Sequence, residues 1–101
     1  MSSAAAPLLQ LEQFAPLVGQ DFVLQASELQ TLRAELLEAR QLPQPPFQGR
    51  QPFSLLFKGP AEFVLEQRTY RLTHPDFPSL DIFLVPVGRD EQGVRYEAVF
   101  S

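Results

Sequence analysis

The sequence predicts a mainly β domain of the α+β class: a small antiparallel β-barrel or two-layer sheet of five to six strands with a short N-terminal helix. Short segments in which apolar and polar residues alternate recur along the chain, separated by glycine and proline turns. The chain also ends in an apolar, aromatic strand pattern at residues 96–100, which is atypical of a solvated tail. We therefore expect the last strand to complete the fold.

The length of 101 residues has room for one core. We expect a single compact domain over residues 8–101, preceded by a flexible leader of Ser, Ala and Pro at residues 1–7. An amphipathic helix is predicted over residues 8–18, because apolar residues recur there at helical spacing and Gly19 follows as a stop. Its apolar positions are Leu8, Leu11, Phe14, Ala15 and Val18. A short strand is predicted at residues 21–25.

Residues 27–42 admit two interpretations. Ser27 and Gln30 have the spacing of a capping box, and Leu29, Leu32 and Leu36 could form a helical stripe. The same residues also alternate as a strand does, with Leu32, Ala34 and Leu36 on one side. The residues by themselves leave helix and strand open for the central part, residues 28–40.

The second half contains four strand patterns, and the last three are joined by short turns that predict an antiparallel meander. These patterns cover residues 53–58, 69–74, 80–87 and 94–100. Residues 80–87 are almost wholly apolar, which is typical of a strand covered on both faces. Pro86 cannot donate to a β-ladder, so we expect it at a strand end, an edge or a bulge. Residues 88–93 are predicted to form a polar hairpin loop with glycine at each end.

The composition argues against several classes of partner. The net charge is −4 and the eight basic residues are scattered, whereas nucleic-acid binding requires clustered Lys and Arg. No stretch approaches the roughly 18 apolar residues of a membrane helix, and residues 1–6 lack the pattern of a secretory signal. The chain has no cysteine, which is compatible with a reducing compartment. We expect a cytoplasmic protein with neither nucleic acid nor membrane as a partner.

His74 is the residue best suited to acid–base catalysis, since it is the single histidine and lies near Asp76 and Asp81 in the sequence. Catalysis requires a nucleophile, a base and an orienting group together, and no serine elbow or cysteine accompanies His74. One histidine and no cysteine also make a poor ligand set, and Asp90–Gly93 suits a hairpin turn better than a calcium loop. We expect no catalytic residues, no metal and no cofactor.

The proline-rich segment at residues 43–52 is the candidate binding site. It is predicted to be an irregular loop with an aromatic residue between stiff prolines, which would lose little entropy on docking. We expect Pro43, Pro45, Pro46 and Phe47 to contact a partner protein or a second copy of the chain. The alternative is that Phe47 folds back onto the sheet as a lid on the core.

With these residues considered, the chain resembles an uncharacterised bacterial family of proteins of about this length. The resemblance extends over nearly the whole sequence and includes PFSLLFKGP at residues 52–60 and YEAVF at residues 96–100. It favours a strand over residues 29–39 and implies no catalytic residues. Some members of the family accompany phage-tail-like proteins.

The resemblance and the residues together favour a non-enzymatic binding or assembly module, a component of a larger bacterial or phage-tail-like apparatus that binds a protein partner or itself. A small-ligand-binding β-barrel is the alternative, and a small hydrolase or isomerase using His74 is a weaker one. A filled core with an exposed sheet edge would favour assembly, and an apolar cavity inside the barrel would favour a ligand.

Overall fold

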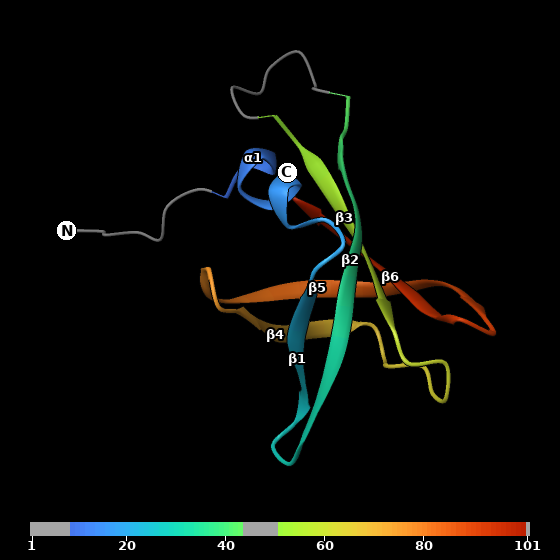
Figure 1. Ribbon diagram of the computed structural model, residues 1–101. Helices are drawn as coiled ribbons and strands as arrows, with labels where there is room; N and C mark the ends of the chain where they lie inside the picture. The colour runs from blue at the N-terminus through green and yellow to red at the C-terminus, as the bar shows by residue number, and fades with distance from the viewer. Residues whose placement is uncertain (1–8, 44–50, 101) are drawn as a thin grey trace.

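The computed structural model describes residues 9–43 and 51–100. Within these residues, six strands form a closed antiparallel barrel in the order β1-β2-β3-β6-β5-β4 (Figure 1). The strands are β1 (Asp21–Ser27), β2 (Gln30–Gln41), β3 (Phe53–Gly59), β4 (Arg68–His74), β5 (Phe77–Asp90) and β6 (Gly93–Phe100). The barrel and its short helix confirm the predicted fold class.

The N-terminal helix is shorter than the predicted residues 8–18. It consists of α1 (Leu11–Phe14) followed by the 3₁₀ turn η1 (Ala15–Leu17). Pro16 has no N–H to continue the α-helical hydrogen bonds, so the chain tightens into the 3₁₀ turn. Three residues per turn place Leu17 on the same side as Phe14, and both are buried. Val18 is therefore exposed, contrary to the prediction that it faces the core.

Residues 30–41 form β2, which decides the helix-or-strand ambiguity in favour of a strand. Leu24 lies opposite Leu32 and Phe22 opposite Ala34, so the pairing buries apolar side chains from both strands. Ser27 caps no helix; its hydroxyl accepts a hydrogen bond from the backbone N–H of Leu29 in the β1–β2 turn. The tertiary pairing thus overrides the local helical propensity.

The prediction that residues 80–87 are covered on both faces is wrong. Ile82 and Leu84 are buried, whereas Phe83 is 51% exposed and Val87 is 53% exposed. Each strand of an antiparallel barrel has one face toward the core and one toward solvent, so a continuous apolar run does not imply two covered faces. Pro86 lies at a register shift between β5 and β6, so of the three predicted places, a strand end, an edge or a bulge, it occupies the bulge.

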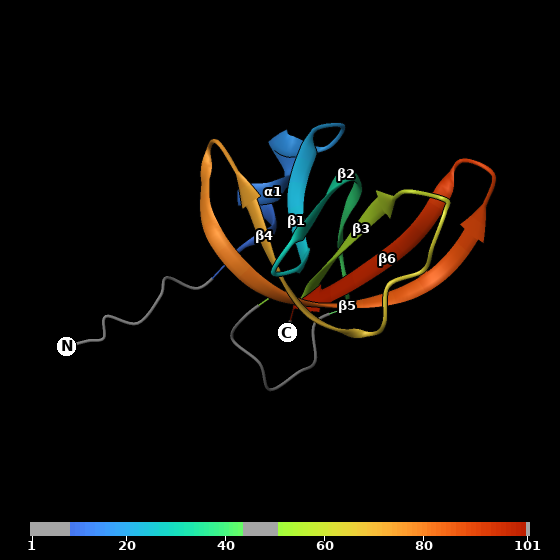
Figure 2. The same ribbon diagram turned by 90° about the horizontal axis from the view of Figure 1, so that it is seen from below.

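The long strand β5 curves around the barrel and changes partner along its length (Figure 2). It pairs with β4 through Leu84 and with β6 from Val85 onward. Its hairpin with β6 is tighter than the predicted loop at residues 88–93, because the strands continue to Asp90 and Gly93 and only Glu91 and Gln92 lie between them.

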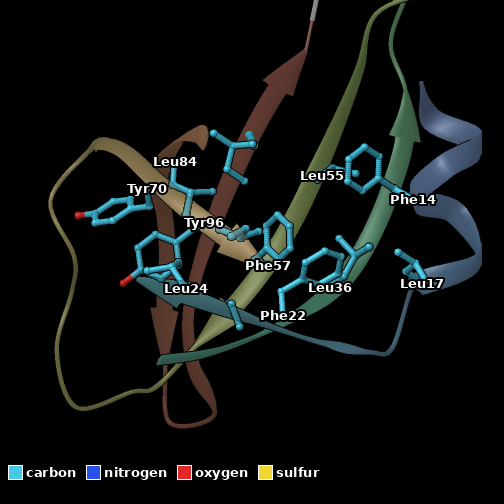
Figure 3. Close-up of a cluster of buried hydrophobic side chains, with 14 of the residues drawn as sticks. Phe14, Leu17, Phe22, Leu24, Leu36, Leu55, Phe57, Tyr70, Leu84 and Tyr96 are labelled. Atoms are coloured by element: carbon cyan, nitrogen blue, oxygen red, sulfur yellow. The ribbon is translucent and has the colours of Figure 1, made fainter. Parts of the chain in front are cut away.

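Buried side chains from all six strands and from the helix meet in the barrel interior (Figure 3). At one end, the Phe14 ring lies 4.9 Å from Phe77, and Phe53 stacks on Phe100 at 4.7 Å. The other end carries Tyr70 and Tyr96, which are both buried.

Both tyrosine hydroxyls hold the loop between β3 and β4. The Tyr96 hydroxyl accepts a hydrogen bond from the Leu65 N–H at 2.9 Å, and the Tyr70 hydroxyl donates to the Glu66 carbonyl at 2.6 Å. Burial raises the pKa of Tyr70, as expected for a phenol taken out of water. The loop is thereby tied to the barrel by two buried side chains.

The C-terminal strand belongs to the core. β6 pairs with β3 from Val94 to Phe100 and with β5 from Gly93 to Glu97. Val94, Tyr96 and Ala98 are buried, in the alternation that the sequence predicts.

Deletion of residues 96–101 is therefore expected to unfold the protein. Truncation of one large buried side chain costs about 3–5 kcal/mol, and domains of this size hold about 5–15 kcal/mol in total. In matched variants of the same strand, Tyr96→Ala should destabilise by about 3–5 kcal/mol and the outward-facing Val99→Ala by less than about 0.5 kcal/mol. Urea denaturation followed by circular dichroism measures both, and an unchanged unfolding curve for the truncated chain would contradict the assignment of β6 to the core.

The β5–β6 turn depends on Asp90. Its carboxylate accepts the Gln92 N–H at 2.9 Å and pairs with Arg95 at 2.8 Å. The Gln92 backbone bond, followed by the Arg95 charge, lowers the pKa of Asp90 below its ordinary value of 3.8. A carboxyl whose pKa is lower in the folded state stabilises the fold above its unfolded pKa, and this contribution is lost as the pH falls through the folded pKa.

We expect an NMR titration of Asp90 to have its midpoint below 3.8. In Arg95→Gln part of the lowering should remain, because the hydrogen bond from the backbone N–H of Gln92 is the largest single cause. A return of the midpoint to 3.8 in that variant would show instead that the cation dominates.

Candidate functional site

The predicted loop site lies mostly outside the described residues. Pro43 is exposed directly after β2, while Pro45, Pro46 and Phe47 are not among the residues that the structure describes. The base of the loop is held by a hydrogen bond from the Leu42 N–H to the Pro52 carbonyl at 3.0 Å. The contact of Phe47 and its prolines with a partner stays a prediction.

His74 is enclosed in a structural hydrogen-bond arrangement. The side chain is 8% exposed, and its ring centroid lies 4.8 Å from that of Phe22. The Asp76 N–H donates to Nδ1 at 3.0 Å, so Nε2 carries the proton and donates to Gln20 Oε1 at 2.7 Å. Asp81 lies elsewhere, since it pairs with Arg71 at 3.0 Å. Among the residues that the structure describes, no carboxylate is hydrogen-bonded to His74, and its ring ties the β4–β5 turn to Gln20, directly before β1.

A shallow depression of about 220 Å³ lies outside the barrel, lined by Asp21, Arg33, Glu35, Lys58, Gly59 and Pro60. Its two cations pair with its two acids, Arg33 with Asp21 at 3.5 Å and Lys58 with Glu35 at 3.6 Å. A charged ligand would have to replace these ion pairs, so the depression offers little to bind one.

The described ranges contain neither a cluster of metal-ligand side chains nor a membrane-spanning helix. Over residues 9–43 and 51–100, no group of three or more His, Cys, Asp or Glu side chains is placed to hold a metal ion. In the same part of the chain, no helix is long and apolar enough to cross a membrane.

The outer face of β5, β6, β3 and β2 carries the main exposed apolar surface near the C-terminal strand. Phe83 is 51% exposed and Val99 is 59% exposed, while Val85 and Leu56 are half-buried beside them. We call this surface the outer patch; it comprises Phe83, Val85, Glu97, Val99, Leu56, Ser54, Glu38 and Arg40. The positions on β5, β6 and β3 alternate with buried residues, and Glu38 and Arg40 of β2 lie opposite Leu56 and Ser54, so all of these positions are on the outer side of the sheet. Ser54 itself is buried there, with 5% of its surface exposed.

Three charged residues of the outer patch have no partner among the residues that the structure describes. Glu97 is half-buried between Leu56 and Val85, while Glu38 is exposed beside Leu56 and Arg40 is exposed beside Ser54. None of the three side chains makes a hydrogen bond or an ion pair with another described residue. By contrast, Lys58 and Arg95, the next cations on the same face, are paired with Glu35 and Asp90.

The sequence patterns do not reveal the outer patch, although a signal is present in them. Glu97 and Val99 stand at the positions opposite to the predicted core residues of the last strand. Phe83 and Val85 lie in a run whose apolar character suggests burial on both faces. Which strands lie next to one another, and therefore which outward residues form one surface, is set by the barrel order.

A comparison with protein families gives one finding for this chain. A family model described as "Domain of unknown function (DUF6916)" matches residues 9–100. The match covers all six strands and the helix. No curated protein and no solved structure matches the chain.

We expect His74→Gln to lower stability and to leave association unchanged. A glutamine side chain cannot make both hydrogen bonds of His74, to Gln20 and to the Asp76 N–H, with the same geometry. One buried polar group left without a hydrogen bond costs about 1–3 kcal/mol of stability. Urea denaturation measures the loss, and analytical ultracentrifugation measures association. If the chain had a turnover and this substitution reduced it by about 100-fold, His74 would be a general acid–base group and this structural assignment would fail.

Proposed function

We propose that this chain, which belongs to the DUF6916 family of domains of unknown function, is a non-enzymatic binding or assembly module. Its binding surface is the outer patch. The loop at residues 43–52, predicted from the sequence, leaves the barrel between β2 and β3, two strands that also contribute to this patch. The finer proposal is that the module is a component of a larger bacterial or phage-tail-like apparatus, which the resemblance found in its sequence implies.

The single observation that carries the proposal is the exposure of Phe83 and Val99 on one sheet face. Isolated apolar residues on a surface are ordinary, but here two of them flank the half-buried Val85 and Leu56. Covering such side chains removes apolar area from water at about 25 cal/mol per Å². Docking of a protein on this face is therefore favourable.

The filled interior supports binding at the surface rather than inside the barrel. Large side chains such as Phe22, Phe57 and Tyr96 occupy the interior between the described strands. A ligand-binding barrel requires an internal cavity, and these side chains fill the space in which a ligand would bind. The enclosed hydrogen bonds of His74 likewise support a role in the fold over a role in catalysis.

The double variant Phe83→Ser and Val99→Ser tests the proposal. We expect it to lose association with a protein partner, including a second copy, by at least about tenfold, because apolar contacts at the centre of an interface dominate its affinity. The measurement is capture on the immobilised chain from a host lysate, followed by titration of the captured protein.

The control is Val23→Ser, which removes a valine of 47% exposure from the outer face of β1 and leaves the outer patch intact. Melting curves verify that each variant is folded. Equal association by the double variant and by the wild type would overturn the outer patch as the binding surface.

A further inference from the structure

We draw no further inference here: the strongest candidate, the apolar outer patch across β5, β6, β3 and β2, has two carboxylates, Glu38 and Glu97, and one guanidinium, Arg40, without partners among the described residues, and nothing in the structure shows what covers it.

Discussion

The barrel depends on the pairing of β6 between β3 and β5. This last strand joins the first half of the chain, which contributes β1 to β3, to the β4–β5 hairpin. The second closure, between β1 and β4, involves only the short register from Val23 to Gln25. Tyr96 and Ala98 of β6 are buried in the barrel core, so the pairing of this strand and the formation of the core occur together. Without β6, the strands β1 to β3 and the β4–β5 hairpin each lack a neighbouring strand.

Two long strands make this closure possible by changing partner along their length. β2 pairs with β1 up to Glu35 and with β3 from the same residue onward, and β5 passes from β4 to β6 after Leu84. Each has a register shift near its second pairing, and a bulge adds the local twist that a small barrel needs. The passage of β5 to β6 also brings Val85 beside Glu97, so the same bend that closes the barrel assembles the outer patch.

The proposal that this chain is a binding module rests on its surface. The polar groups best suited to chemistry are already engaged: His74 with Gln20 and Asp76, and Asp81 with Arg71. Glu38, Arg40 and Glu97, which have no partner among the described residues, lie on an apolar sheet face and not in an enclosed pocket. This arrangement is the basis of the proposal that the chain recognises another protein by charge and shape.

The sequence by itself determined the fold class, the strands of the second half and the inward face of β6, and it limited Pro86 to a strand end, an edge or a bulge, because alternation and proline chemistry act within a few residues. It left residues 28–40 undecided, since their helical spacing and strand alternation are nearly equal until β1 and β3 pair with them. It placed Val18 in the core, where the 3₁₀ turn at Pro16 puts Leu17. Only the tertiary structure decided the outer patch, because its residues come from four strands that become neighbours through the order of the barrel.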